Sequence, residues 1–165
     1  MRAEQSVFAL PLCMEGNALP QADRIRLDKW CARPAGHSYK VTGTNSSAGK
    51  QLGLKLTPSQ ALALPGTVFF PIATADQIRG GVVVIVAGKS AYVHSISVDP
   101  RLETAISLRQ QRCIFGAILD RWGSAEFVAD TRMAEKWNRV LPRWGFSITR
   151  TEKPNVGSWF TVVQE

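Results

Sequence analysis

Cysteine and histidine are scarce in this chain of 165 residues. The three cysteines, Cys13, Cys31 and Cys113, are an odd number at wide spacing, which excludes a disulfide framework. The two histidines, His37 and His94, have no neighbouring ligand at metal-site spacing, whereas a structural zinc site usually needs four Cys or His ligands. The sequence therefore predicts reduced, packed thiols and no metal.

Long apolar runs are also lacking, since none approaches the roughly 18 residues that a membrane-spanning helix needs. The longest run, 81–87, has the length and the β-branched composition of a strand. The N-terminus leads into a short apolar stretch broken by Pro11, without the apolar core and small-residue cleavage site of a signal peptide. We therefore expect a protein that is not secreted and that has no membrane partner.

Acidic residues are the minority among the charged side chains. Lys and Arg number 20 against 13 Asp and Glu, which gives a formal net charge of +7. The cations are spread along the chain and form no basic tail. This balance predicts either an anionic partner, such as nucleic acid, phosphate groups or an acidic protein surface, or a basic protein without such a partner. Composition leaves both interpretations open.

What is present is the composition of an ordinary globular protein, with 45% hydrophobic and 20% charged residues. The length suits one domain with a sizeable core, so we expect a single domain over 1–165. Glycines and a Thr/Asn/Ser cluster predict a loop-rich insert at 34–66. Hydrophobic periodicity predicts, in chain order, strand 6–12, helix 20–33, a helical turn from Thr57, strands 68–73, 81–87 and 91–98, helix 102–122, strand 125–129, helix 131–141, and strands 145–149 and 159–163.

Several signals refine these elements. Short links predict an antiparallel meander over 68–98, with turns at 76–80 and 88–89. Pro71 predicts an edge or bulged strand, and Gly123 predicts the end of the long helix. Glu103 is expected to cap the start of that helix. The side chains expected to be buried are Ile25, Leu27, Trp30 and Cys31 in the first helix, Leu102, Ile106, Cys113, Ile114, Ala117 and Ile118 in the long helix, Met133, Trp137, Val140, Leu141 and Trp144 in and after the last helix, and the tryptophans Trp122 and Trp159.

This order of elements resembles the fold of GNAT (GCN5-related N-acetyltransferase) proteins. The stretch 95–100, Ser-Ile-Ser-Val-Asp-Pro, resembles the family's strand that leads into the acyl-CoA loop, and 140–146 resembles its helix end leading into Gly-Phe. The resemblance covers 67–165 well and 6–33 weakly. It implies an α/β (α+β) fold with a mixed, mostly antiparallel central sheet flanked by helices.

Two chemical parts of the family pattern are missing. The family's loop carries glycines that let backbone N–H groups approach the CoA pyrophosphate at a helix N-terminus. The matching stretch 101–108 has no glycine, and Glu103 adds a negative charge. The family's general-acid tyrosine aligns with Leu141, which cannot deliver a proton. Some GNAT-like proteins of tailed phages keep the scaffold and lose the loop, and this chain is similar to them.

The leading hypothesis from the sequence is a non-catalytic GNAT-like domain without a cofactor. It would serve as a structural or assembly component with other proteins as partners, in the cytoplasm or within a virion. The first alternative is an acyl-CoA-dependent N-acyltransferase with an atypical cofactor loop, with acetyl-CoA as its cofactor. In that case the resemblance implies His94 as the catalytic base and, as cofactor contacts, Ile96, Val98, Arg101 and Thr104.

A second alternative is a nucleic-acid-binding module. Cations recur along the last helix at intervals of four, three and four residues, and so form one basic stripe. The stripe predicts either a solvated face near Glu135 or a contact for an anionic partner. Its members, the candidate partner-binding residues, are Arg132, Lys136, Arg139 and Arg143.

Overall fold

The computed structural model of the protein describes residues 13–31, 56–87, 89–129, 131–153 and 157–164. The predicted strand 6–12 and most of the insert 34–66 lie outside the described residues. The elements in chain order are β2 (Met14–Glu15), a 3-10 turn (Gly16–Ala18), α1 (Gln21–Trp30), α3 (Pro58–Leu62), β3 (Val68–Thr74), β4 (Gln77–Ala87), β5 (Ser90–Val98), α4 (Thr104–Trp122), β6 (Ser124–Ala129), α5 (Thr131–Arg143), β7 (Phe146–Lys153) and β8 (Gly157–Gln164).

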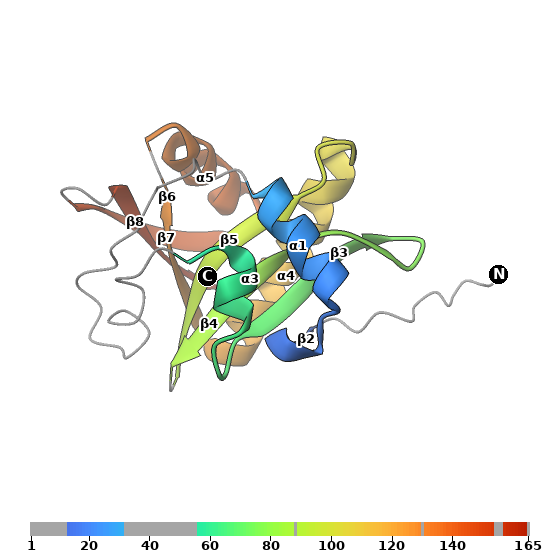
Figure 1. The fold of residues 1–165 in the computed structure, drawn as a ribbon. Helices are drawn as coiled ribbons and strands as arrows, with labels where there is room; N and C mark the ends of the chain where they lie inside the picture. Colours follow the sequence, from blue (N-terminus) through green and yellow to red (C-terminus); the bar gives the residue numbers. More distant parts are fainter. Residues whose placement is uncertain (1–12, 32–55, 88, 130, 154–156, 165) are drawn as a thin grey trace.

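The strands form one seven-stranded sheet in the order β2-β3-β4-β5-β6-β8-β7. Every neighbouring pair is antiparallel except β5 and β6, which run parallel. Figure 1 shows α1 and α3 in front of the sheet and α4 behind it. The mixed, mostly antiparallel sheet flanked by helices confirms the predicted fold class.

The sheet separates two hydrophobic cores. The larger core joins one face of the sheet to α4 and α5, with Phe70, Phe115 and Trp137 among its members. The smaller core joins the other face to α1 and α3, and it contains Leu27 and Trp159. Both faces of the sheet are therefore covered, as expected for an α/β layer structure.

The meander of β3, β4 and β5 confirms the predicted antiparallel arrangement, but its first turn is shorter than expected. The turn consists of Ala75 and Asp76, both with positive φ, at 47° and 65°, which a tight two-residue hairpin requires. Gln77 to Gly80 continue the strand instead of belonging to the turn. Pro71 lies where expected, because β3 has only the two-residue β2 on its outer side and carries a bulge after Ile72.

Helix α4 begins at Thr104 and not at Leu102, because the Leu102 N–H donates to the Asp99 carbonyl in the preceding turn. Gly123 ends the helix with a φ of 81°, as predicted. The predicted buried face is partly wrong, since Cys113 is exposed whereas Phe115 is completely buried. The aromatic rings of Trp137 in α5 and of Trp144 after it pack against Phe115, and they determine which side of α4 faces the core.

The remaining helices follow the sequence in most respects. In α1, Leu27 is buried as predicted, but Ile25 is 56% exposed and so lies outside the core. The predicted helical turn is α3, where Thr57 and Gln60 form a reciprocal capping box. Helix α5 buries its expected apolar side, with Trp137 and Leu141 inside the larger core. The four tryptophans Trp122, Trp137, Trp144 and Trp159 are core or near-core residues, as predicted.

Candidate functional site

The parallel strands β5 and β6 meet at a single residue pair, Tyr92 with Glu126. Since β5 continues to Val98 and β6 to Ala129, the two strands separate towards their C-terminal ends. Cys31, which follows α1, forms an isolated antiparallel bridge to Ser97 beside this separation. The result is a gap in the strand pairing in the middle of the sheet, here called the opening, which lies between β5 and β6 and which the end of α1 borders at Ser97.

A β-bulge in β5 lies at this opening. Val83 pairs with Ser95 and Val84 pairs with Val93, so His94 is the extra residue of the bulged strand. Such bulges change the direction in which a side chain points, and they often lie next to active sites. His94 is only 7% exposed, and its Nδ1 lies 3.1 Å from the Ser95 Oγ. The sequence candidate therefore lies at the opening, and it is buried and bonded to its neighbour.

Glu126 is a candidate site residue that the sequence analysis missed. Its Oε1 accepts a hydrogen bond of 3.0 Å from the Trp159 Nε1. The Trp159 ring lies 5.8 Å from the ring of Tyr92, the register partner of Glu126. A carboxylate in the middle of a strand whose neighbours Ala125 and Phe127 are buried was the signal that could have found it. Glu126 therefore provides a proton-accepting group where β5 and β6 separate.

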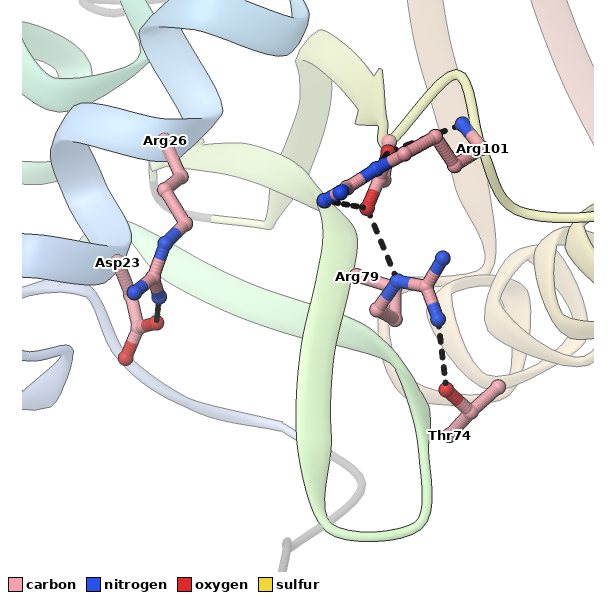
Figure 2. A network of polar contacts seen from close by, with 6 residues as sticks. Asp23, Arg26, Thr74, Arg79 and Arg101 are labelled. Atoms are coloured by element: carbon pink, nitrogen blue, oxygen red, sulfur yellow. Dashed lines mark hydrogen bonds and ion pairs between the residues drawn. The ribbon is translucent and has the colours of Figure 1, made fainter.

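The turn after β5 is organised by Asp99, another residue that the sequence analysis missed. Its side chain is 1% exposed. The carboxylate accepts from the Arg101 backbone N–H at 2.9 Å, from the Arg101 guanidinium at 3.2 Å and from the Arg79 Nε at 3.0 Å. Figure 2 shows Arg79 reaching from this carboxylate to Thr74, with Arg101 on the other side. The hydrogen bonds from Arg101 and then from Arg79 hold the pKa of the Asp99 carboxyl well below its usual range.

The N-terminus of α4 follows this turn. Glu103 occupies the N-cap position, but its side chain makes no capping hydrogen bond, so the predicted self-capping is wrong. Thr104 and Ala105 are exposed, and the Arg101 side chain is 82% exposed beside them. The first N–H groups of a helix, its positive dipole end and a guanidinium together attract anions. Without glycine, this turn still presents an anion-attracting helix end, opposed by the exposed Glu103.

The structure places the predicted cofactor contacts in one continuous path. Ile96 and Val98 are half-buried at the end of β5 and pack against the larger core. Arg101 and Thr104 follow at the turn and the helix end. Leu141, which aligns with the family's general acid, is completely buried in α5 and serves packing. In the described ranges, no group of three or more His, Cys, Asp or Glu could hold a metal ion.

The basic stripe of α5 lies apart from this opening. Arg132, Arg139 and Arg143 are exposed, whereas Lys136 is half-buried with its Nζ 5.4 Å from the centre of the Trp137 ring. Burial lowers the pKa of Lys136. Glu135, the acid expected near the stripe, pairs instead with Arg150 on β7 at 3.0 Å. None of the helices in the described part is long and apolar enough to cross a membrane.

Comparison with known proteins rests on structure alone. No protein-family profile matches the chain, and no curated protein sequence matches it either. Among solved structures, Tetrahymena GCN5 has a TM-score of 0.56 with 11% identity, covering 87% of this chain and 88% of its own. A PaiA N-acetyltransferase from Thermoplasma acidophilum, in complex with coenzyme A, has a TM-score of 0.55 with 7% identity, covering 93% and 98%.

These neighbours correct one expectation from the sequence. The sequence predicted a domain of this fold without a cofactor. This prediction is wrong for the fold, because the Thermoplasma protein of the same fold is in complex with coenzyme A. The missing glycines led to that error, since they were taken as the only means of approaching a phosphate. A putative acetyltransferase with a TM-score of 0.51 and 17% identity has the same architecture across 94% of the chain. The fold of this chain is that of the GNAT N-acetyltransferases.

Proposed function

We propose that this protein is an acyl-CoA-dependent N-acyltransferase with an atypical cofactor turn. The observation that supports the proposal best is the separation of β5 and β6 after one residue pair, with a bulge at the same point. This opening interrupts an otherwise continuous sheet. The end of β5 beside it leads into the turn before the N-terminus of α4, so we expect an extended ligand with an anionic end to bind along this strand.

The residues present fit coenzyme A in two respects. Beyond Tyr92 the edge of β5 is not paired with β6, and Cys31 pairs with it at Ser97. The part of the edge between these two points can hydrogen-bond the amide groups of an extended arm. The helix end and Arg101 attract phosphate groups. Glu103 works against them, so we expect weaker binding than a glycine turn would give. Ile96, Val98, Arg101 and Thr104 would contact the cofactor.

Bound acyl-CoA would supply an activated thioester. Acyl transfer to a primary amine would form a C–N bond, break the C–S bond with release of coenzyme A as its thiolate, and require a base for the proton of the amine. Two residues of this chain at the opening can accept that proton, His94 in the bulge and Glu126 on β6. The rigid Tyr92–Trp159 pair and the bond from Trp159 hold Glu126 in place.

The experiment measures coenzyme A and acetyl-CoA binding by calorimetry and turnover against a panel of amines. Ala105→Glu places a carboxylate in the exposed first turn of α4, where it also suits the helix dipole, so the fold is retained. We expect this variant to lose binding at least tenfold, while the matched neutral variant Ala105→Gln binds as wild type does. Equal binding by both variants, or no binding by the wild type, contradicts the proposal.

A second candidate function is the assembly role that leads in the sequence analysis. Its support is the glycine-free turn with Glu103, together with Leu141 in the core where the family pattern has its acid. In that case the domain would contact other proteins as a structural component, for example of a phage virion. Bound CoA without turnover of any amine, together with isolation in a stable complex, would favour this candidate over the enzyme.

A further inference from the structure

Positive charge is concentrated on two helices. Together α4 and α5 carry seven Lys or Arg and two acidic residues, a formal charge of +5. The whole chain carries +7, so all other residues together contribute only +2. Both helices cover the same face of the sheet, since their buried residues belong to the same core. Among the residues that the structure describes, the positive surplus therefore lies on the face of the sheet that α4 and α5 cover.

The outward sides of the two helices form one surface. The helices pack together through aromatic rings, with Phe115 of α4 5.7 Å from Trp137 and 6.2 Å from Trp144. Both acids are engaged elsewhere: Asp120 accepts from Gln164 at 2.8 Å, and Glu135 pairs with Arg150. Arg121 of α4 lies against the Trp122 ring and donates to the Cys13 Sγ. Five further exposed arginines of the two helices have no ion pair with any described residue: Arg109, Arg112, Arg132, Arg139 and Arg143.

The surface is charged without being apolar. The large hydrophobic side chains that are exposed in the described part are Ile25 on α1 and Val163 on β8. Stable protein interfaces have a buried apolar core depleted of charged residues, and this surface offers none. Arginine instead matches phosphate groups, because its planar guanidinium donates two parallel hydrogen bonds. The chemistry favours a phosphate polymer over an acidic protein.

We propose that the α4/α5 face, defined by these five arginines, binds nucleic acid through the phosphate backbone, without reading base sequence. Binding of this kind is driven by release of counterions as cations neutralise phosphates. None of these five arginines is among the residues assigned to the cofactor or to proton transfer. The proposal thus goes beyond the N-acyltransferase function and does not depend on it.

The test uses a fluorescently labelled, mixed-sequence DNA duplex and the full chain, with anisotropy measured over a salt series. Arg139→Gln/Arg143→Gln removes two charges from the α4/α5 face. Arg26→Gln/Lys29→Gln removes two from α1 on the opposite face and is the matched control, since both variants have the same net charge. For each phosphate that the protein no longer neutralises, the slope of log K against log salt becomes shallower by about 0.9. We therefore expect the slope to fall by roughly 1.8 and the affinity about tenfold in the first variant only.

Three results would overturn the proposal. The first is absence of duplex binding by the wild type at low salt, and the second is equal weakening in the two variants, which would mean that net charge alone acts. The third is tighter binding of polyglutamate than of the duplex with the same dependence on Arg139 and Arg143, which would assign the face to an acidic protein. Thermal unfolding confirms that both variants fold, and unchanged coenzyme A binding separates this outcome from that of the acyltransferase proposal.

Discussion

At the scale of single residues, Asp99 fixes the shape of the turn between β5 and α4. A turn rich in glycine reaches its shape through backbone freedom. Here a buried carboxylate holds the turn by accepting bonds from its own neighbour and from Arg79 on the next strand. Nothing local in the sequence reveals this, because Arg79 lies twenty residues away and its partner is known only once β4 and β5 pair.

We predict that Asp99→Asn lowers the melting temperature at neutral pH more than Arg101→Gln does, because it weakens the contacts of two arginines. The folded pKa of Asp99 lies below its unfolded value of about 3.9. As pH falls, Asp99 therefore binds a proton in the unfolded chain before it does so in the folded protein. The stabilisation by its carboxylate is complete above the unfolded pKa and is lost as pH falls below it towards the folded pKa. Melting curves should show a constant gap between wild type and variant from pH 8 to about pH 5 that narrows below about pH 4. A gap that persists undiminished to the lowest pH would contradict the assignment, and Asp76→Asn in the exposed hairpin turn controls for loss of one charge.

Two glycines offer a matched test of close packing. A Cβ at Gly81 would overlap the ring of Phe69, whereas a Cβ at Gly116 would meet nothing within 4 Å. We predict that Gly81→Ala lowers the free energy of unfolding by about 1–3 kcal/mol through overpacking. Gly116→Ala, inside helix α4, should raise it by roughly 0.5–1 kcal/mol. Urea unfolding of both variants measures the difference, and similar values for the two would show that Phe69 moves aside easily.

At the scale of elements, β3 is a strand whose outer edge is closed by a side chain. The amide of Gln110 on α4 accepts from the Ala73 N–H at 2.9 Å and donates to the Ala73 carbonyl at 2.7 Å. Pro71 removes a further donor nearby. Among the described residues only the two-residue β2 pairs with this edge, so Gln110 and Pro71 add protection of the kind by which natural sheets avoid pairing with other chains.

We predict that Gln110→Ala lowers the free energy of unfolding by about 1–2 kcal/mol, because two hydrogen bonds to the backbone are removed. The variant should also associate as concentration rises, since the edge at Ala73 is then open. Gln110→Glu keeps the hydrogen-bond acceptor and loses the donor. Its free energy of unfolding should therefore lie between those of the wild type and of Gln110→Ala. Denaturant curves and light scattering over a concentration series give both readouts. A variant that stays monomeric and as stable as wild type would show that the edge needs no such protection.

The elements differ in how far their sequence determined them. Period-two and helical patterns predicted the meander, α4 and α5, because each buries one continuous apolar side. The exposure of Cys113 and Ile25 could not be predicted in this way, since a helix with several apolar residues can rotate about its axis until its partners select a face. Phe115 is buried because Trp137 of α5 and Trp144, which follows α5, pack against it.

At the scale of the whole molecule, the sequence indicated the fold but not the site. The order of elements was sufficient for the architecture, because short links and the right-handed crossover restrict the topology. The opening depends on where β5 and β6 stop pairing. No sequence pattern around His94 or Glu126 shows where this happens. The charge asymmetry between the two faces is likewise visible only once α4 and α5 lie on the same side of the sheet.

The single pair between β5 and β6 has a consequence for how the chain acquires its structure. It divides the sheet into an N-terminal meander and a C-terminal unit of β6, β8 and β7, each held by long antiparallel ladders of its own. The ladders of β3 with β4, of β4 with β5 and of β7 with β8 join neighbouring segments of the chain and can form early, whereas β6 pairs with β8 only across α5 and with β5 only across α4. Helix α4 thus connects the two parts of the sheet, and the opening is the junction where they meet.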